Sequence, residues 1–449
     1  MPRTYLIKPV LDQYYSCITH GRGIYLYDEA GNKYIDGSSG AVTASIGHGV
    51  QDIIEAMDMQ AKKISFVYRS QFSTRIAEDL AKKMSDISPG DLNWSFFVNS
   101  GSEATETTMK IAIQYWQEKG IKTKTKIISR WMSYHGITMG ALSMSGHISR
   151  RERFETLLDR YPSVSAPYYY RDANGRTTEQ CDDYYAAELE KEILRVGSEH
   201  IAAFIAEPIV GAAGGALTPS KDYFKKIKAV CEQYDVLFIA DEVMTGVGRT
   251  GKMFAMEHFG VVPDIMATGK GMSAGYTPIA AAVVSEHVME PILQGSKSIM
   301  SGHTFSANPQ SAATALAVIN YIEKNNLVQK SADNGIYLKE KINRLAEKSK
   351  IIGDIRGKGL FIGVEFVKNK ATKETFPRKF DLVNQIVQAN FEEELLVYPA
   401  NAGEDGLNGD AVILAPPLTI SKAEIDDLVA RFTRSLERVE RSIVRELVQ

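Results

Sequence analysis

The sequence contains little cysteine, no long apolar run and almost no excess of charge. Its three cysteines, Cys17, Cys181 and Cys231, are odd in number and show no paired spacing. We therefore expect no disulfide framework and a reducing, cytoplasmic location. Residues 1–10 lack the apolar core of a signal peptide, and no stretch approaches membrane-spanning length, so we expect no membrane association.

The charge balance also limits the classes of partner. Lys and Arg number 52 against 55 Asp and Glu, a net charge of -3, which gives no reason to expect nucleic acid as a partner. The eight histidines show no metal-ligand spacing such as H-E-x-x-H, so we expect no metal site. A hydrophobic share of 44% over 449 residues is typical of a globular protein with more than one domain.

The order of the expected elements predicts an α/β fold with a second, smaller unit. From about Gln51 to Thr304, short apolar strands alternate with helical patterns, which favours a mostly parallel sheet covered by helices. The later part mixes long helices with short strands, as in an α+β unit. We expect a large domain at 51–305, and a small domain formed by 1–50 together with 306–449.

The stretch 236–271 contains the residues that are best suited to catalysis. Asp241 and Glu242 follow the apolar run Val236–Ala240, at the end of a strand where ligands bind in open α/β sheets. Lys270 stands between two glycines after a second apolar run. A lysine can hold an aldehyde cofactor as an imine, and a carboxylate can keep a pyridine nitrogen protonated, as in pyridoxal phosphate enzymes. The alternative is an ordinary strand-end acid and a surface lysine.

A different cofactor is suggested by three glycines in the same stretch. Gly246, Gly248 and Gly251 form G-x-G-x-x-G after a strand, and Asp264 lies near the offset of a ribose-binding acid. A single match of this kind is weak evidence. The two acids directly before the loop would also repel a pyrophosphate.

A phosphate site is predicted where the strand Trp94–Val98 ends. A turn containing Gly101 and Ser102 follows, and then a helical pattern that runs to about Glu118. The turn's N–H groups and the helix dipole both favour an anion. Ser102 could instead simply cap the helix.

Two further strand ends carry candidate residues. Tyr134 comes soon after an expected strand at 126–129, and its ring could stack on a flat heteroaromatic ring or serve only in packing. Glu207 directly follows the strand Ile201–Ala206 and is a third acid at a strand end.

Seven motifs occur in one order along almost the whole chain. They are NSGSEA at Asn99, YHG at Tyr134, AEP at Ala206, DEVMTGVGRTG at Asp241, GKG at Gly269, HTFSANP at His303 and RGKGLFIGVE at Arg356. In this order they resemble the class III aminotransferases, pyridoxal phosphate enzymes of fold type I. That fold has a large domain with a mostly parallel seven-stranded sheet and a smaller α+β domain. The resemblance also makes the glycine-rich loop a family loop, in place of a dinucleotide site.

The resemblance implies two catalytic residues. Lys270 is similar to the Schiff-base lysine, which also moves a proton between substrate and cofactor carbons. Asp241 is similar to the partner of the pyridinium nitrogen, and its charge makes the ring an electron sink. A desolvated Lys270 near positive charge would have a lowered pKa.

Further cofactor contacts follow from the same resemblance. Val243 and Tyr134 would pack on the two faces of the cofactor ring, and Glu207 would lie beside it. Gly101 and Ser102 would hold the phosphate. Thr304 resembles a residue that reaches the phosphate of the neighbouring subunit, which implies a homodimer with shared sites that could pair into a tetramer.

The implied reaction is a ping-pong transamination. An amine donor leaves as a carbonyl compound, the cofactor stays behind in its amine form (PMP), and a keto acid reverses the steps. Epimerases and an aminomutase share the fold type, the cofactor and its motifs, so an isomerase is the alternative. A non-catalytic binding protein is the third reading, against which the intact Lys270 and Asp241 argue.

The substrate pocket departs from the family pattern. Arginines that bind a substrate carboxylate in two branches of the family are replaced here by Ile413 and Tyr398. Arg69 is one candidate to take over that role, because its segment lines the substrate entrance in relatives; otherwise it is a surface arginine. Val42 stands where amine transaminases carry a large aromatic residue, which predicts a roomier pocket. We therefore expect ω-amino acids or amines as donors, with pyruvate or a similar keto acid as acceptor.

Overall fold

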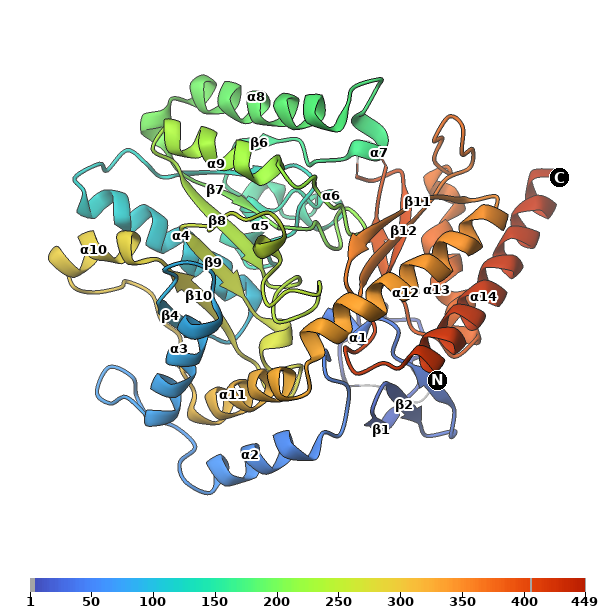
Figure 1. The fold of residues 1–449 in the computed structure, drawn as a ribbon, viewed down its shortest axis with the longest axis horizontal. Coiled ribbons are helices and arrows are strands. Elements are labelled where there is room, and N and C mark those ends of the chain that lie inside the picture. The colour runs from blue at the N-terminus through green and yellow to red at the C-terminus, as the bar shows by residue number, and fades with distance from the viewer. Residues whose placement is uncertain (1–4, 404–405, 449) are drawn as a thin grey trace.

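The computed structural model describes residues 5–403 and 406–448 (Figure 1). Its centre is a seven-stranded sheet whose strands lie in the order β4 (Trp94–Val98), β10 (Ala280–Val284), β9 (Ile265–Thr268), β8 (Leu237–Glu242), β7 (Ile201–Ala206), β5 (Lys126–Arg130) and β6 (Ser163–Val164). Neighbouring strands from β9 to β6 pair in parallel. Strand β10 is antiparallel to both of its neighbours, β4 and β9. The predicted α/β fold with a mostly parallel seven-stranded sheet is confirmed.

Helices cover both faces of this sheet, which explains why β7 and residues Leu237–Ala240 of β8 are apolar. Phe204 and Phe238 pack toward α8 (Thr178–Val196) and α9 (Tyr223–Gln233). Ile205 and Ile239, the next residue of each strand, pack toward α4 (Gly101–Glu118) and α10 (Glu286–Gln294). Successive strand residues point to opposite faces, so a strand buried on both sides needs apolar residues at nearly every position.

A smaller antiparallel sheet forms the second unit. Its order is β11 (Ile352–Lys358), β12 (Phe361–Phe366), β14 (Asp410–Leu414) and β13 (Tyr398–Asn401). The long helices α12 (Leu327–Lys348) and α14 (Lys422–Val448) lie with α13 (Leu382–Glu392) beside this sheet (Figure 1). This is the predicted α+β part.

The remaining elements connect or flank these two sheets. The N-terminal part forms a three-stranded antiparallel sheet of β1 (Ile18–Arg22), β2 (Tyr25–Asp28) and β3 (Lys33–Ile35). The helices α2 (Gln51–Ala61), α3 (Arg75–Ile87) and α11 (Pro309–Lys324) pack together. The short helices are α1 (Ser39–Val42), α5 (Met139–Met144), α6 (Ile148–Arg151) and α7 (Tyr169–Asp172). The 3₁₀ turns are η1 (Glu155–Leu157), η2 (Ser198–His200), η3 (Ala255–His258), η4 (Lys270–Met272) and η5 (Arg378–Phe380).

Strand β8 extends beyond the expected run Val236–Ala240. It continues through Asp241 and Glu242, because both residues pair with β9. The division into domains at residues 50 and 305 stays a prediction. In the described part of the chain, no helix is long and apolar enough to cross a membrane.

Candidate active site

A cavity of about 170 Å³ lies at the carboxyl ends of the central parallel strands. Its lining residues come from turns and strand ends far apart in the sequence: Gly101, Ser102, Tyr134, His135, Gly136, Glu207, Ala212, Asp241, Val243, Met244 and Lys270. Of the residues predicted to contact a cofactor, all but Thr304 are in this set. The fold therefore brings the two predicted catalytic residues and most of the predicted binding residues to one place.

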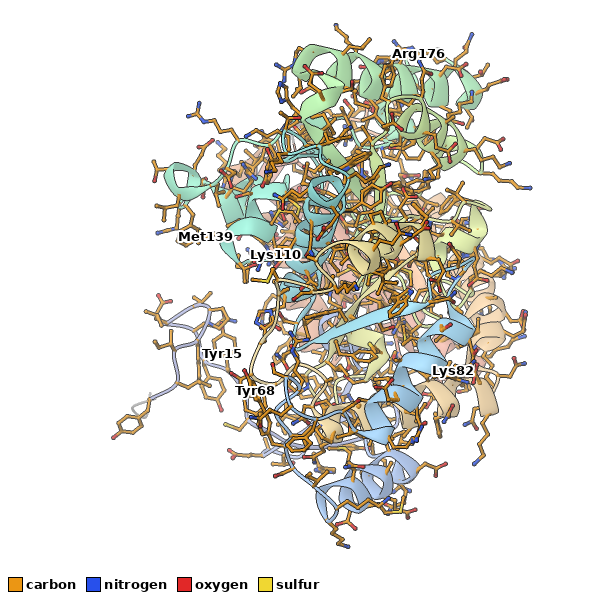
Figure 2. The ribbon with its side chains drawn as sticks, turned by 90° about the vertical axis from the view of Figure 1, so that its left-hand side faces the viewer. Tyr15, Tyr68, Lys82, Lys110, Met139 and Arg176 are labelled. Carbon is orange, nitrogen blue, oxygen red and sulfur yellow. The ribbon has the colours of Figure 1, made fainter. Side chains whose placement is uncertain are left out.

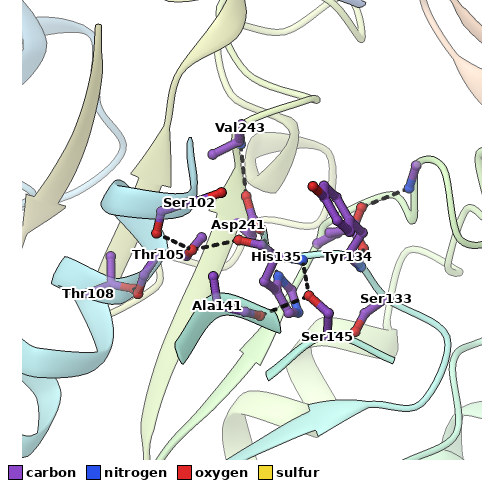
Figure 3. Close-up of polar contacts among 12 residues, drawn as sticks. Ser102, Thr105, Thr108, Ser133, Tyr134, His135, Ala141, Ser145, Asp241 and Val243 are labelled. Atoms are coloured by element: carbon purple, nitrogen blue, oxygen red, sulfur yellow. Dashed lines mark hydrogen bonds and ion pairs between the residues drawn. The ribbon is translucent and has the colours of Figure 1, made fainter. Parts of the chain in front are cut away.

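Asp241 is held by hydrogen bonds from two sides. It lies at the end of β8 with 3% of its surface exposed. Its Oδ1 accepts a hydrogen bond from the Val243 amide at 3.0 Å, and its Oδ2 lies 2.7 Å from Nδ1 of His135 (Figure 3). Because the carboxylate is fixed in this way, it can present its charge to one point of the cavity.

His135 is a site residue that the sequence analysis missed. Its ring is buried, its amide donates to Ser145 Oγ at 2.8 Å, and its carbonyl accepts from Thr105 Oγ1 at 2.6 Å. Among the described residues, its Nε2 has no hydrogen-bond partner. The available signal was its place directly after Tyr134 at a strand end, but nothing in the sequence indicated that it faces Asp241.

Lys270 occupies a strained position at the first residue of the turn η4, shortly after β9. Its φ of +42° lies in the left-handed region, which is unusual for a side chain other than glycine and is typical of functional sites. Burial lowers the pKa of the Lys270 amine to about 8, although Asp241 and Glu207 attract the proton; Arg150 adds to the lowering. A substantial fraction of this amine is therefore neutral near pH 8 and can act as a nucleophile or base.

The N-terminus of α4 forms a narrow cradle suited to an anion. Ser100 caps the helix, because its Oγ accepts from the Glu103 amide at 3.2 Å, and the first helical amides have no partner within the helix. Ser102 Oγ accepts from the Ile137 amide at 3.0 Å. Gly136 has a φ of +138°, and a Cβ on it would lie 2.5 Å from Ser102 Oγ. The cradle therefore requires glycine at this position.

Glu207 fixes the loop that carries Tyr134. Its Oε1 accepts from the Tyr134 amide at 3.0 Å, and its Oε2 accepts from the Gly211 amide at 2.9 Å. Burial raises the pKa of the Glu207 carboxyl, with Asp241 adding to the rise and His135 opposing it. The side chain thus connects two turns that line the cavity.

Thr304 and Arg69 lie away from this cavity. Thr304 is exposed on the segment between α10 and α11. Arg69 donates from Nη2 to the Ser301 carbonyl at 2.6 Å, and its guanidinium lies 4.6 Å from the Phe96 ring centre. It lines a separate cavity of about 420 Å³. Within one chain, therefore, neither residue contributes to the cavity that holds Lys270.

The other predicted pocket residues form an apolar wall. Val42 and Ile413 are buried in one cluster with Met244, and Tyr398 packs against that cluster. Met244 also lines the cavity, so the wall adjoins it. The two positions expected to correspond to family arginines, Ile413 and Tyr398, thus belong to apolar packing here.

The glycine-rich loop does not have the structure of a dinucleotide site. Its residues are largely buried, and the next helical element is the short turn η3. Arg249 donates to the carbonyls of Leu360 and Pro416 at 3.0 and 2.6 Å, which ties the loop to the second unit. Asp264 binds Lys228 at 2.8 Å. The loop opens no α-helix, so the dinucleotide interpretation is wrong.

The family is decided by comparison with known proteins. The family model described as aminotransferase class-III matches residues 7–436. The chain belongs to the class III aminotransferases. These enzymes depend on pyridoxal phosphate and act on amines and keto acids. This aminotransferase is 53% identical over 443 residues to an uncharacterized aminotransferase of Bacillus subtilis (strain 168), covering 99% of this chain and 100% of that one. It is 34% identical over 430 residues to the putrescine–pyruvate aminotransferase of Pseudomonas aeruginosa, with 95% and 91% coverage.

Solved transaminases share the fold over nearly the full length. An (S)-enantioselective omega-transaminase from Thermomicrobium roseum has a TM-score of 0.91 and 36% identity, covering 97% of this chain and 96% of that one. An omega transaminase from Pseudomonas jessenii in complex with PMP has a TM-score of 0.89 and 35% identity, with 95% and 93% coverage.

The residues of this aminotransferase fit the family's cofactor. The cavity offers an anion cradle at α4, a fixed carboxylate at Asp241 and a reactive amine at Lys270. These are the three groups that a phosphate, a pyridine nitrogen and an aldehyde require. Among the described residues, no group of three or more His, Cys, Asp and Glu side chains could hold a metal ion.

Proposed function

We propose that this aminotransferase moves an amino group from an ω-amino acid or amine to a keto acid such as pyruvate, by a ping-pong mechanism with pyridoxal phosphate. The observation that carries the proposal is the apolar wall of Val42, Ile413 and Tyr398 beside the Lys270 cavity. An apolar wall suits the uncharged part of an amine donor, whereas a carboxylate there would need a bidentate cation. The putrescine–pyruvate and omega-transaminase relatives support the same class of donor.

The chain's own residues have distinct parts in this mechanism. When bound, pyridoxal phosphate supplies an aldehyde for the amino group and a ring that withdraws electrons from the substrate carbon. The Nζ of Lys270 would take the proton from that substrate carbon and deliver it to the former aldehyde carbon of the cofactor, on the other side of the shared nitrogen. Asp241, held by Val243 and His135, would keep a proton on the ring nitrogen.

The remaining contacts would fix the cofactor in place. The amides of Gly101 and Ser102 at the α4 terminus would bind the phosphate. Val243 and Tyr134 would enclose the ring from its two faces, and Glu207 would hold the Tyr134 loop in position. These residues keep the reacting carbon within reach of Lys270 and exclude water from it.

We also propose a homodimer, which could pair further into a tetramer, with Thr304 reaching the partner's phosphate. Large apolar side chains are exposed on this chain, including Tyr68 (54%), Phe72 (64%), Met300 (81%) and Phe305 (57%). Figure 2 shows Tyr68 and Met139 on the face toward the viewer, and Tyr15 on an N-terminal segment that extends from the main body. A second copy would bury such a surface. The free thiols Cys17, Cys181 and Cys231 support the proposed cytoplasmic location.

A visible absorption spectrum of the purified holoenzyme tests the proposal. Amines and amino acids are added one at a time without a keto acid. Loss of the cofactor's yellow band with an amine donor, and its return with pyruvate, would support transamination. A band that persists while an amino acid loses optical purity would indicate an epimerase. No band after addition of pyridoxal phosphate, or reaction only with α-amino acids such as ornithine or glutamate, would contradict the proposal.

A further inference from the structure

Arg150 lies beside two residues of the candidate site. It belongs to the short helix α6, in a segment whose sequence gave no chemical signal. Its guanidinium carbon lies 4.4 Å from the ring centre of Tyr134, which lines the Lys270 cavity. Its guanidinium also lies close to the hydroxyl of Tyr398, beside the apolar wall, where its positive charge opposes the rise that burial causes in the pKa of this tyrosine. The arginine thus stands where the cofactor cavity meets the substrate wall.

The positive charge of Arg150 acts electrostatically on the Lys270 amine. Arg150 is one of the charges that lower the pKa of the Lys270 amine, and it also lowers the pKa of His147, after the larger effect of burial. In residues 5–403 and 406–448, Arg150 forms no ion pair with a carboxylate. A half-buried cation without a counterion, at the edge of a substrate cavity, is well placed to bind an anion.

Other arginines around the site are already engaged. Arg151 donates from Nη1 to the carbonyls of Leu142, Ser143 and Ser145. Arg249 is fully occupied in tying its loop to the second unit. Arg130 donates from Nη2 to the Glu207 carbonyl, and its Nε and Nη1 have no partner among the described residues, but its side chain is fully buried and so is closed to a substrate. Arg69 lines a separate cavity. Within this chain, Arg150 is therefore the best-placed guanidinium for a substrate.

We propose that Arg150 binds the carboxylate of the keto acid acceptor and that Tyr398 positions its guanidinium. The tyrosine that replaces a family arginine would thus hold another arginine, delivered from α6. Stacking on Tyr134 and the nearby Tyr398 hydroxyl fix the plane of the guanidinium, which a bidentate contact requires. The inference rests on the proposed function, and it explains how one pocket takes both a charged acceptor and an uncharged amine.

The test compares two acceptors of similar size with the same amine donor. Pyruvate carries a carboxylate, and propanal does not. For Arg150→Ala, we expect kcat/KM with pyruvate to fall by about 10- to 100-fold relative to kcat/KM with propanal, because a hydrogen-bonded charge pair is lost. Arg150→Lys should recover part of this loss, since lysine keeps the positive charge but lacks the two parallel N–H donors of the guanidinium. Tyr398→Phe should show a smaller loss in the same direction.

A matched control and a binding measurement separate this role from a structural one. Arg153 is exposed in the same segment, so Arg153→Ala removes an equal charge. It should leave the acceptor ratio, which is kcat/KM with pyruvate divided by kcat/KM with propanal, unchanged. Propanoate, compared with chloride at equal ionic strength, should raise the Tm of the wild-type holoenzyme but not that of Arg150→Ala.

The outcomes distinguish the two proposals. An unchanged acceptor ratio in Arg150→Ala, or an equal loss with both acceptors together with a lowered Tm, would overturn the role of Arg150 while the transaminase proposal stands. A wild-type enzyme that transfers no amino group to either acceptor would instead overturn the proposed function.

Discussion

His135 and Asp241 form a buried pair in which Nδ1 of the ring lies 2.7 Å from the carboxylate Oδ2. The pair joins two segments that are 106 residues apart in the sequence. Because the ring N–H and the Val243 amide bind different oxygens, the carboxylate cannot rotate freely. A cofactor nitrogen approaching Asp241 would therefore meet a charge that is already oriented, which reduces the reorganisation needed for binding.

Replacing His135 should weaken both the site and the fold. In His135→Ala, the buried Asp241 loses a hydrogen bond, so we expect kcat to fall about 10- to 100-fold and the free energy of unfolding to fall by about 1–3 kcal/mol. Steady-state kinetics and denaturant unfolding of the apoprotein measure these effects. His287→Ala is the control, because its ion pair with Asp264 at 3.2 Å involves a half-exposed ring. Equal behaviour of the two variants would contradict a special role for His135.

The sequence predicts the sheet from local patterns, whereas the catalytic roles at its strand ends followed from the resemblance to a family. Continuous apolar runs such as Ile201–Ala206 are typical of strands buried on both faces, and acids at the ends of parallel strands then lie at one edge of the sheet. Strand β10 runs antiparallel to its neighbours, and no pattern within its five apolar residues distinguishes that direction from the parallel one.

Residues that meet through tertiary packing could not be predicted in the same way. Arg150 lies in a polar segment with no motif, and only the fold brings it onto Tyr134 and Tyr398. His135 gives no sequence signal of its contact with Asp241, which depends on where two distant strands end. The placement of Arg69 against Ser301, outside the cavity, likewise depends on two loops distant in the sequence.

Removing the Lys270 amine should stop the reaction without unfolding the protein. We expect Lys270→Ala to have no measurable turnover, because no other described lysine lines the cavity, yet to retain cofactor through the α4 cradle and Asp241. Turnover assays and dialysis followed by phosphate analysis of the retained cofactor provide the check. Lys252→Ala removes an exposed lysine and should keep full activity. Normal turnover in Lys270→Ala would defeat the mechanism.

The lowered pKa of Lys270 should appear in the rate of cofactor capture. Burial lowers this pKa from 10.5 to about 8, so the neutral amine, which is the reactive form, is populated at lower pH than in an ordinary lysine. The rate at which apoprotein binds pyridoxal phosphate covalently should rise about tenfold per pH unit below pH 8 and level off above it. Stopped-flow absorbance from pH 6 to 10 measures this profile. A rate that still rises steeply at pH 10 would show an unperturbed lysine.

The same shift has a consequence for stability, with a defined sign. Between pH 8 and 10.5, the unfolded state binds a proton at Lys270 that the folded state has released, so this residue makes stability rise with pH across that window. Below pH 8, the folded protein holds Lys270 as a buried cation, and this lowers its free energy of unfolding. Lys270→Met removes the titrating amine. The amount by which its free energy of unfolding exceeds that of the wild-type apoprotein should therefore shrink between pH 8 and 10.5. Denaturant unfolding at both pH values measures the difference, and a constant advantage would contradict the shift.

A single methyl group at Gly136 should damage the phosphate cradle. In Gly136→Ala, the new Cβ would lie 2.5 Å from Ser102 Oγ and 2.8 Å from Ser102 Cα, so the α4 terminus must move. We expect the affinity of the apoprotein for pyridoxal phosphate to fall about 10- to 100-fold, because several phosphate contacts shift together. Gly175→Ala is the matched control: its φ is also positive, at +82°, and nothing lies within 4 Å of an added Cβ. It therefore also places a side chain at a positive φ, but without the clash. Titration of both variants with the cofactor decides between the explanations, since equal losses would assign the effect to strain and not to the cradle.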